Sequence, residues 1–270
     1  MVMVQAKPGD REYYMDGYLH DNLTYVKDRV LNYKNMMVCI IDGRPGTGKS
    51  TLAAQISYFC SNGHLTLTNE IFTVNQFLEE MKNAKKGDGL ILDEAFDLLN
   101  KRKAQSNQNM IALSILQQMR VRQSFIFIVL PSVFDLDKNI ILNLCDTFIH
   151  TYRKPFGARG QFSVYDIDGL KKLWLYGRQS LSYSPKIAKP NFRGRFTKFF
   201  PLDMEAYEDK KNKALESMKL SEKPEGSKYL TQRNKLIVKM REEGKPVSKI
   251  SDLISLKQRT VYDILKQTEV

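Results

Sequence analysis

A glycine-rich turn between a strand pattern and a helix pattern constrains the fold of this chain more than any other feature. The turn has the spacing G-x-x-x-x-G-K-[ST], and its fixed positions are Gly43, Gly48, Lys49 and Ser50. Residues 38–41 before it form a short, mostly β-branched apolar run, which is typical of a buried strand. After it, apolar residues recur at helical spacing from Leu52 to Cys60, so a strand-turn-helix unit is predicted.

The composition of this turn predicts a site for the phosphates of a nucleotide. Glycines let backbone N–H groups close around an anion at a helix N-terminus, where the helix dipole also favours negative charge. Lys49 is expected to reach the β- and γ-phosphates, and Ser50 is expected to bind Mg²⁺. We therefore expect ATP and Mg²⁺ as cofactors. The predicted nucleotide-binding residues are Gly43, Arg44, Pro45, Gly46, Thr47, Gly48, Lys49, Ser50 and Thr51.

A second motif supplies the carboxylates that hydrolysis requires. In the stretch GLILDE, the apolar residues 90–92 predict another strand, and Asp93 stands at its C-terminal end, where open α/β sheets bind their ligands. Asp93 is expected to hold Mg²⁺ together with Ser50. Glu94 follows directly and is expected to orient and polarise the attacking water. With Lys49 and Glu94 as catalytic residues, the sequence predicts an enzyme that hydrolyses ATP to ADP and phosphate.

The charge distribution points to an anionic polymer as partner. The chain carries 42 Lys and Arg against 30 Asp and Glu, a net charge of +12. Residues 1–150 hold 16 of each kind, whereas residues 151–270 hold 26 basic and 14 acidic residues. The whole excess therefore lies in the second part. Positive charge beside a nucleotide site is typical of a surface that binds nucleic acid, so we expect DNA rather than a membrane as the partner.

The remaining composition indicates a soluble cytoplasmic protein, in the host cytoplasm if a virus encodes it. Cys39, Cys60 and Cys145 stand singly in apolar runs without metal-ligand spacing, so they predict buried free thiols of a reducing compartment. No signal peptide is evident. The apolar run 125–130 is too short to span a bilayer and is expected to be a buried strand.

The middle of the chain carries a resemblance to a known family. A strand, the pair Pro131-Ser132, a helix and a strand over 147–152 follow one another as at the end of the motor core in the FtsK–HerA superfamily of P-loop ATPases, which they resemble. The segments LDEAFDLLNKR and FDLDKNI look most similar to the viral genome-packaging and zonula occludens toxin-like groups. The resemblance covers residues 36–155.

This resemblance implies a fold, an activity and an assembly. The fold is an α/β P-loop NTPase with a RecA-like, mostly parallel sheet. The activity is translocation or packaging of double-stranded DNA by a homo-oligomer, normally a ring, because a neighbour's arginine completes each nucleotide site. Arg120 and Arg122 are the expected trans fingers, and Arg44 inside the loop is the alternative in cis. Many relatives place a sensor glutamine where this chain has Ser132, which we expect to be structural.

Residues 156–218 are expected to extend the core as a basic β-hairpin and a helix. The hairpin is predicted across Asp168-Gly169, and the charged helix over residues 204–218. Between them, residues 189–200 interleave basic with aromatic side chains. This pattern suits a platform for single-stranded nucleic acid or, as we favour for the aromatic residues, a strand whose rings pack on the core.

A small C-terminal domain is predicted beyond a linker over residues 219–228, which are rich in Pro, Gly and Ser. Three helices are predicted after it, the second capped by Ser248. Their apolar positions are Leu236, Ile237, Met240, Ile250, Leu253, Ile254, Val261, Ile264 and Leu265. Residues 244–265 resemble the helix-turn-helix domains of recombinases and regulators, with docking to a protein as the alternative. In that resemblance the third helix enters the major groove and presents Lys257, Gln258, Arg259 and Tyr262.

The predicted organisation has five segments. They are an N-terminal helical segment (1–35), the P-loop ATPase core (36–155), its extension (156–218), the linker (219–228) and the all-α helix-turn-helix domain (229–270). The leading hypothesis is an ATP-hydrolysing, DNA-stimulated DNA motor of a virus or mobile element, with a capsid, portal or recombinase protein as candidate partner. The alternatives are a transposition or replication helper ATPase and an ATP-gated DNA-binding regulator.

Overall fold

The computed structural model describes residues 3–93, 114, 116, 122–154, 157, 159–221 and 225–268. Glu94 and Arg120, two of the predicted catalytic residues, lie outside the described residues. The chain divides into two compact units, Met1–Ala214 and Leu215–Val270, which are described separately below. Among the described residues, no helix is both long enough and apolar enough to cross a membrane.

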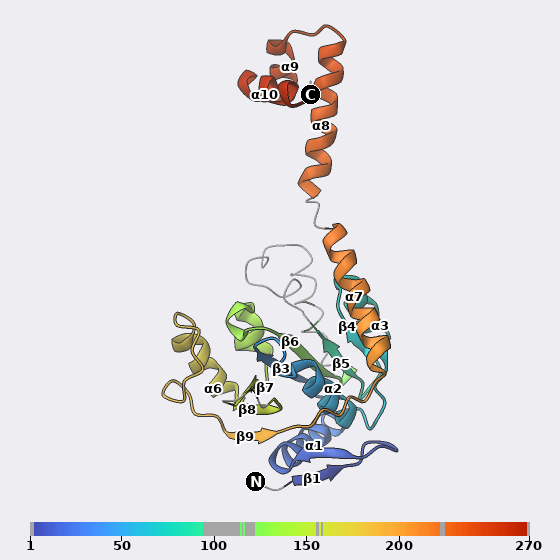
Figure 1. Cartoon of the computed structure of the whole chain (residues 1–270), viewed down its shortest axis with the longest axis vertical. Helices are drawn as coiled ribbons and strands as arrows, with labels where there is room; N and C mark the ends of the chain where they lie inside the picture. The colour runs from blue at the N-terminus through green and yellow to red at the C-terminus, as the bar shows by residue number, and fades with distance from the viewer. Residues whose placement is uncertain are drawn as a thin grey trace. The chain divides into compact units, whose positions relative to one another are not determined.

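The first unit is built on a seven-stranded sheet with the order β4-β5-β6-β3-β7-β8-β9 (Figure 1). Its strands are β3 (Met37–Gly43), β4 (Glu70–Ile71), β5 (Gly89–Leu92), β6 (Phe125–Leu130), β7 (Thr147–Tyr152), β8 (Gln161–Asp166) and β9 (Phe192–Arg195). The first five strands in the order are parallel, and β8 and β9 add to the β7 edge in antiparallel fashion. The α/β class and the mostly parallel sheet predicted from the sequence are thus confirmed.

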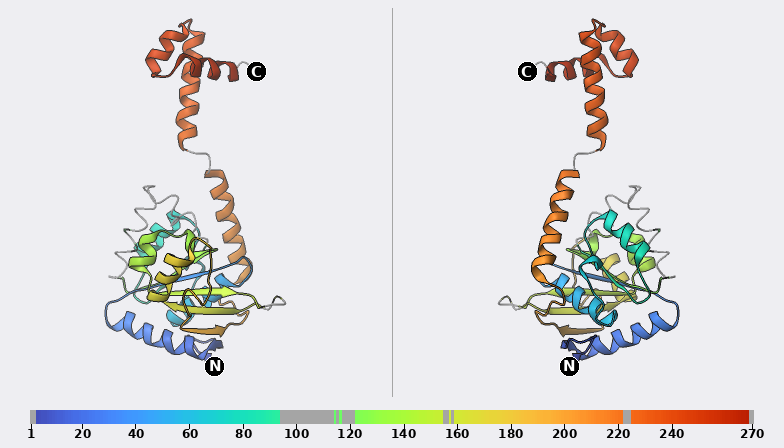
Figure 2. Two further views of the ribbon diagram at one scale, coloured as in Figure 1. Left: turned by 90° about the vertical axis from the view of Figure 1, so that its left-hand side faces the viewer. Right: turned by 90° about the vertical axis from the view of Figure 1, so that its right-hand side faces the viewer.

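Helices cover both faces of this sheet. They are α1 (Gly17–Asn32), α2 (Lys49–Cys60), α3 (Val74–Asn83), α6 (Ile167–Lys172) and α7 (Met204–Ser221), with short 3-10 or π turns over Leu67–Asn69, Val133–Asp135, Ile140–Leu144 and Leu173–Gly177. Figure 2 shows α1 and α6 on opposite sides of the strands. Each face therefore has its own hydrophobic core.

The central strand β3 supplies side chains to both cores, because successive side chains of a strand point to opposite faces. All seven residues of β3 are buried. Val38 and Ile40 pack in the cluster that contains Phe77 of α3 and Leu170 of α6. On the other face, Cys39 and Ile41 pack in the cluster formed with α1 and α2. Burial on both faces is what the near-continuous apolar run of this strand predicts.

The three cysteines are buried free thiols, as predicted from their apolar surroundings. Cys39 and Cys60 lie in the core on the α1 and α2 face, and Cys145 lies in the core on the opposite face. Burial raises the pKa of the Cys60 thiol to about 12 and that of the Cys145 thiol to about 12. These thiols therefore stay protonated at neutral pH.

The N-terminal segment, expected to be helical over residues 1–35, contains the helix α1 and also two strands before it. β1 (Met3–Ala6) and β2 (Tyr13–Asp16) form an antiparallel pair before α1 begins. Tyr13 and Met15 are both buried on one side of the hairpin, a spacing of two that fits a strand. Asp16 then starts α1, because its carboxylate accepts hydrogen bonds from the Tyr18 and Leu19 amides.

The predicted hairpin across Asp168-Gly169 is also wrong, since these residues belong to helix α6. Asp166 ends β8 and caps the helix, with Oδ1 accepting a hydrogen bond of 2.8 Å from the Gly169 amide. The following buried side chains, Leu170, Leu173 and Trp174, recur at spacings of three and four residues. The residues after β8 therefore follow the helical spacing and not the alternation that suggested a hairpin. β8 pairs with β7 and β9.

The second unit has its own helical core. It contains α8 (Glu225–Glu242), α9 (Val247–Ile254) and α10 (Gln258–Thr268), so the three predicted helices are confirmed. Their shared buried residues are Ile237, Val247, Ile250, Val261 and Ile264. Two of the apolar residues expected on the packed faces of these helices, Leu236 and Leu253, lie outside this core and are 49% and 60% exposed. Ser255 takes a left-handed conformation (φ 55°) at the turn between α9 and α10.

Two further sequence predictions for this region need correction. Residues 219–221 and 225–228 of the predicted linker are helical: the first belong to the end of α7 and the second to the start of α8. Pro246, not Ser248, stands at the N-cap of α9. Proline suits this boundary because its φ is already restricted and it has no N–H to satisfy.

Candidate nucleotide-binding site

The turn after β3 has the backbone conformation that its glycines predict. Gly43, Gly46 and Gly48 have φ values of 146°, 72° and 97°, a region that side chains with a Cβ rarely adopt. A Cβ on Gly43 would also overlap the carbonyl oxygen of Thr151. The hydroxyl of Thr47 braces the loop, donating to Arg44 O at 2.8 Å and pairing with Thr151 Oγ1 at 2.7 Å.

The end of the loop is suited to an anion. Helix α2 starts at Lys49, and its N-cap residue Gly48 has no side chain to accept hydrogen bonds from the first-turn amides. Such amides and the helix dipole together favour phosphate oxygens. Lys49 lies in this first turn, with Nζ 3.3 Å from Arg44 O across the loop. The loop, the helix start and Lys49 therefore fit a nucleotide's phosphate chain.

The two residues expected to hold Mg²⁺ come together at the same edge of the sheet. Ser50 is the second residue of α2, and the 1% exposed Asp93 directly follows β5. Tyr207 of α7 contacts this site: its hydroxyl donates to Asp93 Oδ2, and its side chain lines one cavity together with Ser50. A hydroxyl and a carboxylate are oxygen ligands of the kind that Mg²⁺ prefers, so this pair fits the metal.

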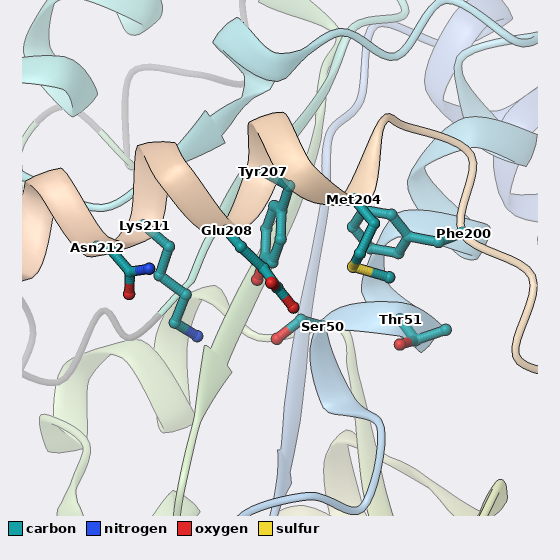
Figure 3. Close-up of a pocket in the computed structure, with 8 residues that line it drawn as sticks. All are labelled: Ser50, Thr51, Phe200, Met204, Tyr207, Glu208, Lys211 and Asn212. Atoms are coloured by element: carbon teal, nitrogen blue, oxygen red, sulfur yellow. The ribbon is translucent and has the colours of Figure 1, made fainter.

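A cavity of about 420 Å³ opens beside these residues (Figure 3). It is lined by Ser50, Thr51, Phe200, Met204, Tyr207, Glu208, Lys211 and Asn212. Ser50 and Thr51 come from the start of α2, whereas most of the other lining residues come from α7. The sequence motifs predicted only the α2 side of this cavity.

Arg153 is a basic residue at the loop that sequence reasoning missed. It follows the last residue of β7, and its Nη2 donates to the carbonyls of Pro45 (3.3 Å) and Gly46 (3.0 Å). The available signal was its position one residue past a parallel strand, at the edge where such sheets bind ligands. Arg153 brings a cation to the phosphate loop from within the same chain.

Asp42 is a second residue that the motifs did not single out. This fully buried carboxylate precedes Gly43 and receives hydrogen bonds from the Val133 amide (2.8 Å) and the Tyr183 hydroxyl (2.5 Å). It also pairs with His150 Nδ1 at 2.7 Å. Burial and the Asp42 charge raise the pKa of Tyr183 well above its usual range, so this phenol stays protonated. The signal was an acid at the end of an otherwise apolar strand.

Ser132 has a structural contact at the end of β6. Its hydroxyl accepts a hydrogen bond of 3.3 Å from the Phe134 amide and so caps the short turn Val133–Asp135. The same oxygen lies 3.5 Å from the Tyr183 hydroxyl. This capping agrees with the structural role expected from the sequence.

Arg122 lies far from the phosphate loop of its own chain. It precedes β6, and β6 runs parallel to β3, so it is at the edge of the sheet opposite to the loop. Its Nη1 donates to the carbonyl of Ala84 at 3.2 Å. Ala84 precedes β5, so this contact also lies at the edge of the sheet away from the loop. A role for Arg122 in cis is therefore excluded, and its role in trans stays a prediction. Arg44, the cis alternative, is exposed.

The aromatic residues of the segment 189–200 pack on the core, as favoured from the sequence. Phe192, Phe196 and Phe199 join the hydrophobic cluster of the α1 and α2 face. Phe199 stacks on Tyr13, with ring centroids 4.6 Å apart. A Cβ on Gly48 would lie 2.8 Å from the Phe196 ring, so this ring lies against the phosphate loop. The basic residues Lys189, Arg193, Arg195 and Lys198 are exposed.

In the second unit, the side chains predicted to contact DNA share the start of one helix. Lys257 precedes α10 and Gln258, Arg259 and Tyr262 lie in its first turns; all four are exposed. The opposite side of α10 supplies Val261 and Ile264 to the core of the unit. Tyr262 is 60% exposed.

Comparison with known proteins gives only distant similarities. No family model and no curated protein sequence matches the chain. The N-terminal domain of zonular occludens toxin from Neisseria meningitidis is 20% identical over 64% of this chain and 98% of that chain, with a TM-score of 0.41. The genome packaging NTPase B204 from Sulfolobus turreted icosahedral virus 2, in complex with ATP-gammaS, is 15% identical over 51% and 94%, with a TM-score of 0.35.

A third solved structure is B204, the DNA-packaging ATPase from Sulfolobus turreted icosahedral virus. It is 20% identical over 50% of this chain and 93% of that chain, with a TM-score of 0.32. With TM-scores of 0.41 or less, these three likenesses carry no conclusion about activity. The function of this chain is therefore inferred from its own residues.

Proposed function

We propose that this chain is a Mg²⁺-dependent ATPase that binds double-stranded DNA and moves it, as in genome packaging, in a ring of identical subunits. The proposal is carried by one observation: Tyr207 hydrogen-bonds to Asp93 and lines one cavity with Ser50, beside the glycine-rich loop that ends in Lys49. A cation ligand pair, a phosphate-binding loop and a lysine within one site are the parts that nucleotide hydrolysis needs.

The residues divide the chemistry as follows. The loop amides and Lys49 bind the phosphates, and Ser50 and Asp93 hold Mg²⁺, which when bound neutralises the charge that develops at the γ-phosphate. Glu94 orients the attacking water and accepts its proton. Buried Asp42 positions the start of the phosphate loop, because its hydrogen bonds to Val133, His150 and Tyr183 fix the end of β3.

Three substitutions test the ATPase. Lys49→Ala is expected to abolish nucleotide binding, and Asp93→Asn to weaken only the Mg²⁺-dependent part of it. Glu94→Gln is expected to keep binding while turnover falls about 10²–10⁴-fold, since positioned base catalysis is lost. Binding is measured by titration with a fluorescent ATP analogue and turnover by phosphate release. Near-parental turnover in Glu94→Gln would remove the role proposed for Glu94.

DNA binding is supported by the second unit and by the charge excess of residues 151–270. The exposed Arg259 on α10 is expected to read a base edge, so Arg259→Ala should lose about 1–3 kcal/mol on a specific site. Lys239→Ala removes the same charge from an exposed position on α8 and is the matched control. If α10 docks to a protein, both variants will bind DNA as tightly as the parent.

A triplex-displacement assay separates the motor from its alternatives. A translocase strips a third strand from duplex DNA when ATP is hydrolysed, whereas a transposition or replication helper ATPase and an ATP-gated regulator leave it bound. Sedimentation with Mg²⁺ and a non-hydrolysable analogue measures the assembly. Capsid, portal and recombinase proteins remain the candidate partners, and co-purification with each would distinguish packaging from recombination.

A further inference from the structure

Helix α7 contributes one face to the nucleotide site although it lies about 110 residues beyond Asp93. Met204, Tyr207, Glu208 and Lys211 recur at spacings of three and four residues and line the cavity beside Ser50. Figure 3 shows these side chains along the helix, opposite Ser50 and Thr51. A single helix face is therefore directed at the position expected for Mg²⁺.

Two polar side chains of α7 engage the residues that are expected to hold the metal. The Tyr207 hydroxyl donates to Asp93 Oδ2, and Tyr207 lines the cavity together with Ser50. Lys211 Nζ lies 3.4 Å from the same Asp93 oxygen. Asp93 and Tyr207 are 1% and 6% exposed.

Contacts on either side hold Tyr207 in this place. Its ring packs between Phe72 and Phe200, with centroid distances of 5.8 Å and 5.0 Å. Three residues further along α7, Lys210 Nζ donates to the carbonyls of Leu67 (2.6 Å) and Glu70 (2.7 Å). The first turns of α7 are thus docked by ring packing and by hydrogen bonds, which hold the Tyr207 hydroxyl on Asp93.

A magnesium ion cannot share these ligands with α7. Mg²⁺ requires near-octahedral coordination, usually with several waters, and draws its charge balance from carboxylates. A phenol hydroxyl on Asp93 Oδ2, in the cavity that Ser50 lines, takes the space of that shell, and the Lys211 ammonium balances the charge that the metal would use. Both groups would have to leave Asp93 before the metal and its water shell could occupy the site.

We propose that α7 is a clamp on the magnesium site, in which Tyr207 and Lys211 hold Asp93 until Mg²⁺ and its nucleotide displace them. This inference rests on the proposed ATPase function. It makes α7 a competitor of the metal, so weakening the clamp should make Mg²⁺ bind at lower concentration. A purely structural role for Tyr207 and Lys211 predicts the opposite, because damage to a binding site weakens binding.

The test is a Mg²⁺ titration of the full chain with a fluorescent, non-hydrolysable ATP analogue. Tyr207→Phe keeps the ring and removes the hydroxyl that binds Asp93, and Lys211→Met removes the competing charge. The half-saturating Mg²⁺ concentration is expected to fall about tenfold in Tyr207→Phe, which is the size of one hydrogen bond to a charged group. Lys211→Met should shift it in the same direction. Lys213→Met, at an exposed position of the same helix, should leave it unchanged.

Hydrogen exchange of the backbone amides in residues 204–214 gives a second readout that does not depend on activity. Exchange is expected to accelerate when Mg²⁺ and the analogue are added together, and to stay constant with the analogue and EDTA. A raised or unchanged Mg²⁺ requirement in both variants, with α7 equally protected throughout, would overturn the clamp. A parent chain that binds the analogue without any Mg²⁺ dependence, or not at all, would instead overturn the proposed ATPase together with the clamp.

Discussion

The Tyr183 hydroxyl donates a hydrogen bond of 2.5 Å to the buried carboxylate of Asp42, although 141 residues separate them in the sequence. Asp42 immediately precedes the first glycine of the phosphate loop. The Tyr183 ring also stacks on His150, with centroids 3.9 Å apart, and His150 binds the other oxygen of the same carboxylate. The segment after α6 therefore supports the loop through one buried charge.

Tyr183→Phe tests how much this support contributes. The variant keeps the ring stacked on His150 and removes only the hydroxyl, so the buried Asp42 loses one of its partners. We expect the free energy of unfolding to fall by about 1.5–3 kcal/mol, the range for a hydrogen bond to a charged group. Denaturant unfolding measures it. Tyr176→Phe, at a side chain 72% exposed, is the control and should stay within about 0.5 kcal/mol of the parent.

Gly46→Ala separates loop strain from loop function. Gly46 has a φ of 72°, and an added Cβ would overlap Arg153 Nη2. Gly157 has a φ of 82° with no atom near its Cβ position, so Gly157→Ala is the matched control. Both variants should lose about 1–2 kcal/mol of stability from the left-handed backbone. Only Gly46→Ala should weaken nucleotide binding in a titration, because it displaces Arg153 from the loop. Equal binding losses in the two variants would contradict this.

Glu70 should make stability depend on pH. Burial raises its pKa well above the ordinary value of 4.5, with the Asp93 charge acting in the same direction, and neither carboxylate oxygen has a hydrogen-bond partner. The folded chain then binds a proton more tightly than the unfolded chain, so stability falls as the pH rises above 4.5 towards the folded pKa. Glu70→Gln should remove this fall in unfolding experiments across pH, whereas exposed Glu79→Gln should retain it.

The second unit offers a packing test with two neighbouring residues of α9. Ile250 is fully buried between the three helices, and Leu253 is 60% exposed. Ile250→Ala should lower the stability of the unit by about 2–5 kcal/mol through the cavity it creates. Leu253→Ala should change it by less than about 0.5 kcal/mol. Circular dichroism of a fragment covering residues 225–270 measures both, and similar losses would mean that the helices pack differently.

Mixed assemblies test whether an arginine acts in trans. An Arg120→Ala, Arg122→Ala double variant and Glu94→Gln should each be inactive alone. Combined, they should regain part of the ATPase activity, because each subunit supplies the half that the other lacks, and an arginine finger contributes about 10³–10⁵ in rate. Phosphate release at several mixing ratios measures the rescue. Its absence, with mixed assembly confirmed by pull-down, would remove both arginines from the nucleotide site.

The sequence predicted those parts of the fold that short segments specify by themselves. The apolar run 38–41 and the glycines after it predicted β3 and the loop, because strand burial and left-handed backbone each leave a local signature. The run 125–130 predicted β6 in the same way. The N-terminal hairpin was missed because its buried side is short, formed by Ala6, Tyr13 and Met15.

The other half of the candidate site could not be predicted because it depends on contacts between distant segments. Tyr207 lies 114 residues from Asp93, and no local pattern distinguishes it from other aromatic residues on a charged helix. The contact between Tyr183 and Asp42 likewise joins residues 141 positions apart, so no local pattern predicts it. The pair Asp168-Gly169 was misread because an aspartate before a glycine suits a tight turn as well as the first turn of a helix, and only the packing of the following residues decides between them.

The three buried cysteines can serve as internal probes of local opening of the structure. A thiol reagent reaches a buried cysteine only when the surrounding structure opens, so the labelling rate reports the free energy of that opening. Cys39 and Cys60 report on the core beneath α1 and α2, and Cys145 reports on the core across the sheet. Labelling with and without nucleotide would therefore show which side of the sheet a bound phosphate chain stiffens, without any substitution.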